Sequence, residues 1–150
     1  MSNPHPTLLR PVRTPEELTA RWEFLAALGH DPEDRDEDRD EDRDGDGADL
    51  LIQLFDPAGH QQGFLVAVEG VRPEPDEELT GNLAGVLAHL LTLETAGAGT
   101  VALALAPHVA RDVVAGDLVW GQALVSACRG ESVAVLGVHL LTGGRAHRLL

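Results

Sequence analysis

The pattern of apolar and polar positions begins with a short amphipathic helix. Thr14 can accept hydrogen bonds from the free N–H groups of a first helical turn, and Pro15 and Glu17 suit the positions that follow such a cap. The apolar positions behind them recur every three or four residues, at Leu18, Trp22, Leu25 and Leu28. This spacing predicts a helix from Pro15 to about Leu28, closed by Gly29, whose apolar stripe must rest on another part of the protein.

A run without apolar residues separates this helix from the rest of the chain. Asp34–Asp44 reads DRDEDRDEDRD, and Asp31–Asp49 holds 12 acidic and 3 basic residues. Like charges at this density repel one another, and the run offers nothing to bury. We therefore expect an N-terminal arm with the helix over 1–30, a disordered acidic linker over 31–48, and a single α/β domain over 49–150.

The region after the linker alternates strand patterns with helix patterns. Leu50–Phe55 and Gly63–Glu69 read as two strands joined by a turn at Asp56–Gly59, which predicts a hairpin. The later segments are a helix with an apolar face from Leu79 to Leu93, a strand at Thr100–Ala106, a helix from Asp117 to about Arg129, a β-rich run at Val133–Thr142, a Gly143-Gly144 turn and a return strand at Arg145–Leu150. The order is helix, acidic linker, then β-β-α-β-α-β-β. It indicates an α/β fold with a mixed sheet, an α+β arrangement being the alternative.

Composition and charge narrow the classes of function. The 150 residues carry 25 acidic and 11 basic side chains, a net charge of −14, and every basic residue is Arg. Binding to a nucleic-acid backbone is not expected, because it needs clustered Lys or Arg. Cys128 stands alone, so no disulfide framework is expected. The sequence shows neither a membrane-spanning run nor a secretion signal, and we therefore expect a cytoplasmic protein without membrane binding.

Few side chains are candidates for catalysis or for binding a metal or cofactor. Asp40-x-Asp42-x-Asp44-Gly45 looks like the start of a calcium loop, but the twelfth position, where that loop needs Glu, is Leu51. The seven histidines show no metal-ligand spacing. The sequence therefore predicts no catalytic, metal-binding or cofactor-binding residue. For an enzyme the candidates would be His108, Asp112, Asp117 and His139, of which the first three are expected near one sheet edge, where α/β sites lie.

One stretch carries a family resemblance. The strand Thr100–Leu103 is followed by Ala104-Leu105-Ala106-Pro107, Asp117 comes thirteen residues after Ala104, and a later strand contains Gly137-Val138-His139. Together with the order of elements from Leu50 to Thr142, this resembles the JAB/MPN metallo-isopeptidase fold in its bacterial RadC-like branch. That family has His-Asn-His-Pro where this chain has Ala104 to Pro107, and it holds zinc with two His and one Asp. Alanine cannot ligate a metal, so the resemblance implies a degenerate, metal-free member.

These observations predict a non-catalytic protein that acts as a binding or assembly module, without cofactors, for an unknown protein partner. Two alternatives stay open: an unrelated small-molecule or protein-binding α/β module, and a metal-dependent hydrolase or other small enzyme with an unrecognised site. The predicted helix at Asp117–Arg129 has a narrow polar face, with Trp120 and Leu118 on different sides. One side can pack on the sheet. The other meets either the Pro15–Leu28 helix, which we favour, or a second subunit in a homodimer.

Overall fold

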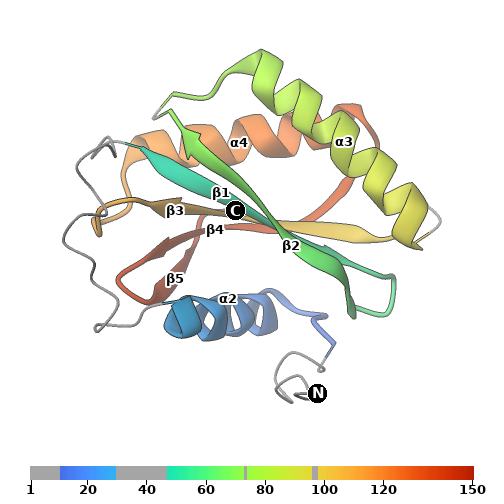
Figure 1. The fold of residues 1–150 in the computed structure, drawn as a ribbon, viewed down its shortest axis with the longest axis horizontal. Helices are drawn as coiled ribbons and strands as arrows, with labels where there is room; N and C mark the ends of the chain where they lie inside the picture. The colour runs from blue at the N-terminus through green and yellow to red at the C-terminus, as the bar shows by residue number, and fades with distance from the viewer. Residues whose placement is uncertain (1–10, 30–46, 73, 96–97) are drawn as a thin grey trace.

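The computed structural model describes residues 11–29, 47–72, 74–95 and 98–150. Its helices and strands follow the predicted order, and they form an α/β fold around a mixed sheet (Figure 1). The elements are α2 (Pro15–Gly29), β1 (Ala48–Phe55), β2 (Gln61–Val71), α3 (Glu77–Thr95), β3 (Thr100–Pro107), α4 (Ala115–Gly130), β4 (Ala134–Thr142) and β5 (Arg145–Arg148). The predicted disorder of the acidic linker falls on residues outside those described, except at its end. Ala48, assigned to that linker, is a buried residue of β1.

The five described strands lie in the order β2-β1-β3-β4-β5. Among these five strands only the β3–β4 pair is parallel, and α4 connects these two strands along the chain. The predicted hairpin of β1 and β2 is confirmed, as is the hairpin of β4 and β5. Gly143 and Gly144 between β4 and β5 both have positive φ, at 60° and 77°, which is why glycines suit that turn.

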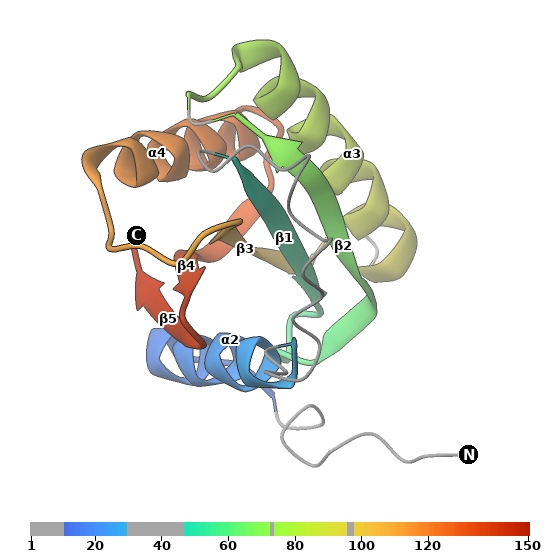
Figure 2. The ribbon, with the colours of Figure 1, turned by 60° about the vertical axis from the view of Figure 1, so that its left-hand side comes forward.

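Helices cover both faces of the sheet. Figure 1 shows α3 and α4 on one side and α2 on the other, and the view in Figure 2 agrees. Alternate residues of β3 serve the two layers: Leu103 and Leu105 face α3 and α4, whereas Ala102 and Ala104 belong to the cluster beneath α2. The sheet therefore separates a layer rich in leucine from one whose central strand carries only small side chains.

The position of α2 corrects one expectation. We favoured a contact between the N-terminal helix and the helix that carries Trp120. Instead, α2 packs on β4 and β5 across the sheet from α4, and the second side of α4 meets α3. The reason lies in β4: a Cβ at Gly137 would be 3.0 Å from Leu18 Cδ2, so a bare backbone lets α2 settle closely on that strand. The Leu28 side chain, part of the predicted stripe, lies outside those described.

The predicted N-terminal cap is found in α2 but not in α4. Thr14 caps α2 as expected, because its Oγ1 accepts a hydrogen bond from the Glu17 N–H at 3.1 Å. The predicted cap of α4 at Asp117 is wrong: the helix begins at Ala115, and Val114 is its N-cap residue. Asp117 still serves the helix start, since its Oδ2 accepts a hydrogen bond from the Val114 N–H at 2.8 Å.

Candidate functional site

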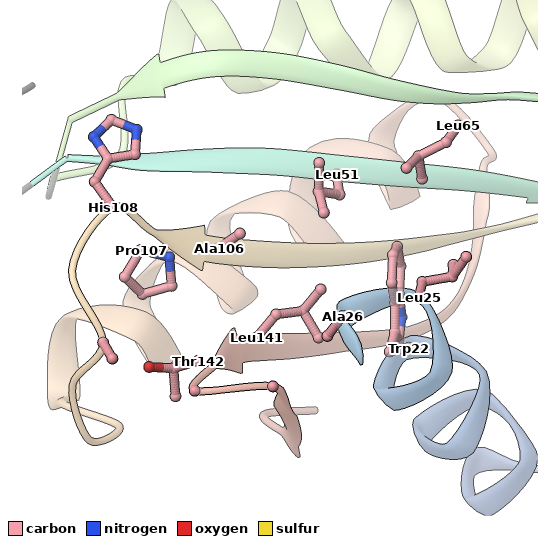
Figure 3. A pocket seen from close by; sticks show the side chains of 13 residues that line it. Trp22, Leu25, Ala26, Leu51, Leu65, Ala106, Pro107, His108, Leu141 and Thr142 are labelled. Atoms are coloured by element: carbon pink, nitrogen blue, oxygen red, sulfur yellow. The ribbon is translucent and has the colours of Figure 1, made fainter. Parts of the chain in front are cut away.

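A pocket of about 520 Å³ opens on the α2 side of the sheet (Figure 3). It lies beside α2, over β1 and β2, and reaches the ends of β3 and β4 and the turn after β4. Thirteen residues line it, and most are apolar: Trp22, Leu25, Ala26, Leu51, Leu65, Ala106, Pro107, His108, Ala110, Leu141, Thr142, Gly143 and Gly144. None of these thirteen described residues carries a carboxylate or a guanidinium group. The pocket can therefore receive an apolar group.

The sequence of β3 helps to explain why space remains here. Across the sheet, Leu51 pairs with Ala104, which in turn pairs with His139. The small side chains of the β3 alanines thus leave space between the larger residues of β1 and β4. Because α2 packs on β4 and β5, it does not fill the space over β1 and β2. Leu65 on β2 remains 43% exposed at the pocket wall.

The polar end of the pocket carries an ordered histidine. His108 follows β3, and its Nε2 lies 2.9 Å from Asp49 Oδ1 on β1. The His108 N–H also donates to the Gly47 carbonyl oxygen at 3.0 Å, and Asp49 Oδ1 accepts from the Gly70 N–H at the same distance. These bonds fix the imidazole at the carboxyl end of β3, where Figure 3 shows it away from Trp22.

The layer beneath α2 also contains buried polar atoms without hydrogen-bond partners. Among the described residues these atoms belong to Trp22, Gln53 and His139. The Trp22 indole N–H is one of them, and the ring stands between α2 and the sheet at the edge of the pocket (Figure 3). An unpaired buried donor or acceptor costs about 1–3 kcal/mol. The layer beneath α2 therefore leaves more buried polar atoms without hydrogen bonds than an ordinary protein core does.

His139, a sequence candidate, is a buried structural residue. Its Nε2 lies 2.6 Å from Thr19 Oγ1 on α2, and that hydroxyl also lies 3.0 Å from the Pro15 carbonyl oxygen. Burial, with a smaller effect of the Arg148 charge, lowers the pKa of His139 to about 4. The neutral ring therefore bonds α2 to β4, and it does not line the pocket.

Asp117 and Asp112 lie near the other end of the loop that begins at His108. Both Asp117 oxygens accept hydrogen bonds from Arg111 at 2.8 Å. Burial alone would raise the pKa of Asp117, but the hydrogen bonds from Arg111 and Val114 and the Arg111 charge outweigh it and lower that pKa. Asp112 is exposed, and its carbonyl oxygen accepts from Arg111. Of the four candidates, only His108 lines the pocket.

Sequence reasoning did not identify the pocket or the partner of His108. Leu51, Leu65 and Leu141 read as ordinary strand residues, and Trp22 as a core residue of a helix. Asp49 lies 59 positions from His108 and entered the sequence analysis only as the last residue in the charge count of Asp31–Asp49. Only the register of β1 with β3 brings the two side chains together. The exposed position of a leucine on an edge strand has no signature in one sequence.

Within the described ranges, no three His, Cys, Asp or Glu side chains are grouped so that they could hold a metal ion. None of the described helices combines the length and apolar character that crossing a bilayer requires. Comparison of the chain with protein-family models, with curated proteins and with solved structures finds no match.

Proposed function

We propose that this protein is a non-catalytic binding module and that its binding site is the pocket beside α2. The observation that carries the proposal is an open, mostly apolar pocket with Trp22 at one end and His108 at the other. The pocket lies at the carboxyl ends of the parallel strands β3 and β4, which is where α/β folds commonly bind ligands. An apolar group placed there would cover Leu65 and the half-buried Leu25 and Leu51.

The resemblance to the JAB/MPN fold fits this proposal, because it offers an evolutionary origin for the pocket. Ala104 and Ala106 stand where that family has its two histidines, and Ala106 lines the pocket. On this view an apolar site has replaced a metal site. Asp117, the position of the third ligand, is bound to Arg111 at the start of α4 instead of facing the pocket.

A small hydrolase is the second candidate, and the His108–Asp49 pair is the observation in its favour. A carboxylate that holds an imidazole in place is one part of a general-base arrangement. Among the described lining residues there is no Ser or Cys, and the one hydroxyl, that of Thr142, accepts a hydrogen bond from the Arg111 N–H at 2.9 Å. His108 would therefore activate water. Saturable hydrolysis of p-nitrophenyl butyrate that His108→Gln abolishes would favour this candidate over a binding module.

Binding is tested with N-phenyl-1-naphthylamine, an uncharged apolar dye that fluoresces when it leaves water. We expect one saturable site in the wild-type protein and a weaker one, by about fivefold or more, in Leu65→Asn, because that wall is partly lost. The matched control is Leu93→Asn, since Leu93 on α3 is 67% exposed and lies far from the pocket. No saturable binding, or an equal loss in both variants, would contradict the proposal.

A homodimer through α4 is a separate proposal for assembly. Trp120 is only 3% exposed and its indole N–H donates to the Arg72 carbonyl oxygen at 2.9 Å, so it cannot make the contact. Leu118 and Val119 on the same helix are exposed and could do so. Light scattering of the full chain tests this: a dimer that Leu118→Glu converts to a monomer supports it, and a wild-type monomer at the highest soluble concentration contradicts it.

A further inference from the structure

We propose that the ligand of the pocket is an uncharged, mostly apolar ring compound that accepts a hydrogen bond through a carbonyl oxygen. This inference rests on the proposed function of the pocket and adds the chemical class of its ligand.

The walls of the pocket suit a flat apolar body. The volume of about 520 Å³ lies within the range of about 300–1,000 Å³ that is usual for small-molecule sites. Figure 3 shows Ala106 on β3 between Leu51 on β1 and Leu141 on β4, so a small side chain lies between two larger ones. The Trp22 ring stands at the end beside α2, and aromatic ligands pack well against such a ring. A flat ring system can therefore lie over Ala106 and contact Trp22.

The charges around the pocket argue against an ionised ligand. None of the thirteen described lining residues carries a carboxylate or a guanidinium group. An anion would lose its hydration without gaining a guanidinium partner, and Asp49, which lies 2.9 Å from the His108 imidazole, would repel it. A cation would find the same Asp49 oxygen already occupied by His108 and by the Gly70 N–H. An uncharged ligand avoids both costs.

Two side chains of the lining have a hydrogen to donate. Thr142 Oγ1 accepts a hydrogen bond from the Arg111 N–H at 2.9 Å, which occupies one lone pair of the oxygen and leaves the hydroxyl hydrogen to donate. The Trp22 indole N–H is buried and has no partner among the described residues. Such donors favour a ligand that accepts hydrogen bonds. The carbonyl oxygen meets Thr142, because that residue is only half-buried, whereas the indole nitrogen is covered.

The test measures how four compounds of similar shape displace the naphthylamine dye from the full-length protein. They are 2-acetylnaphthalene, 2-ethylnaphthalene, 2-naphthoate and 1-(2-naphthyl)ethylammonium, which carry a ketone, no polar group, a negative charge and a positive charge. The hydrocarbon is the reference for apolar contact alone. We expect both charged compounds to bind about tenfold or more weakly than the ketone, because the lining offers neither charge a partner.

A matched pair of variants isolates the Thr142 hydroxyl. Thr142→Val keeps the shape of the side chain and should weaken the ketone by about three- to tenfold, the usual contribution of one hydrogen bond. It should change the affinity for 2-ethylnaphthalene by less than about twofold, because that compound makes no hydrogen bond. Thr92 is exposed on α3, where its Oγ1 donates to the Ala88 carbonyl oxygen, and Thr92→Val should change neither affinity.

The carbonyl ¹³C resonance of bound 2-acetylnaphthalene gives an independent measurement. A carbonyl that accepts a hydrogen bond has its resonance moved downfield. We expect this resonance to lie further downfield in the wild-type protein than in Thr142→Val, a difference that a change in the shape of the pocket alone would not produce.

The outcomes separate this inference from the proposed function. If the dye binds but the ketone does not displace it, or Thr142→Val weakens the ketone and the hydrocarbon alike, the pocket is a binding site and the carbonyl contact is wrong. If either charged compound binds as tightly as the ketone, the pocket does not select uncharged ligands, and the inference is likewise overturned. If neither the dye nor any of the four compounds binds, the proposed function itself fails.

Discussion

The two faces of the sheet hold their helices in different ways. Beneath α3 and α4 the side chains are mostly Leu and Val, and the Trp120 indole N–H there has a partner in Arg72. Beneath α2 the strand β3 offers alanines, and the buried atoms without partners among the described residues belong to Trp22, Gln53 and His139. Gln53 shares this side of β1 with Leu51 and Phe55.

The two layers of this small domain differ in what they contribute to it. We expect the leucine-rich layer beneath α3 and α4 to supply most of the free energy of folding, because none of its described buried side-chain polar atoms lacks a hydrogen-bond partner and such apolar burial is the most favourable packing. The layer beneath α2 contributes less free energy of folding, because it contains buried polar atoms without partners and an open pocket. Binding sites are commonly found in the less stable parts of a structure. We therefore propose that the α3–α4 layer supplies most of the stability and that the α2 layer provides the binding site.

Truncation of a leucine in each layer should show the largest effect. Leu124 on α4 is almost fully buried, and Leu124→Ala should lower the free energy of unfolding by about 2–5 kcal/mol. Leu25 on α2 is half-buried at the pocket wall, and Leu25→Ala should cost about 1 kcal/mol. Urea denaturation measures both. Equal losses of free energy would show that the two layers contribute alike to stability.

Acid should weaken the α2 layer through His139. Its pKa is lowered from 6.5 to about 4 in the folded protein, so between these values the unfolded chain takes up a proton that the folded chain does not. The free energy of unfolding therefore falls as the pH falls through this window, by about 3 kcal/mol when the window is crossed completely.

Urea denaturation at about pH 7 and about pH 5 checks this effect. From the first pH to the second, the wild-type protein should lose about 2 kcal/mol more than His139→Gln does. His89→Gln on the exposed face of α3 is the control and should retain the wild-type difference. A His139→Gln protein with the same pH dependence as wild type would show that this imidazole does not carry the acid sensitivity.

Replacing the unpaired amide of Gln53 by an apolar side chain should stabilise the α2 layer, which would then resemble the layer beneath α3 and α4. Gln53 is fully buried and neither end of its amide has a partner among the described residues. Gln53→Met keeps the length of the side chain without the polar atoms and should raise the free energy of unfolding by about 1–3 kcal/mol. Gln122→Met on the exposed side of α4 should change it by less than about 0.5 kcal/mol. A loss of stability in Gln53→Met would mean that the amide is bonded in solution.

The same contrast explains how far the sequence alone could predict the structure. The elements followed from local patterns: the capped stripe of α2, the hairpin of β1 and β2, and the glycine turn before β5 all depend on neighbouring residues. The site could not be predicted from local patterns, because it depends on which face of the sheet α2 covers and on the register between β1 and β3. A leucine that lines an open pocket and a leucine that fills a core look alike in one sequence.

The sequence candidates show the same limit residue by residue. His108 was expected near the carboxyl end of β3 and does lie there, in the pocket lining. His139 was a candidate for an enzyme, and its bond to Thr19 instead makes it a structural residue. The Thr19 partner could not be foreseen, because it comes from a helix that the sequence placed against α4.

Hydrogen exchange followed by mass spectrometry shows whether α2 opens independently of α4 and whether a bound ligand stabilises it. We predict that the amides of α2 exchange through a local opening, faster than the amides of α4, and that bound naphthylamine dye slows α2 while leaving α4 unchanged. Exchange of α2 and α4 together at the rate of global unfolding, with the dye protecting neither helix or both alike, would contradict a binding site in the α2 layer.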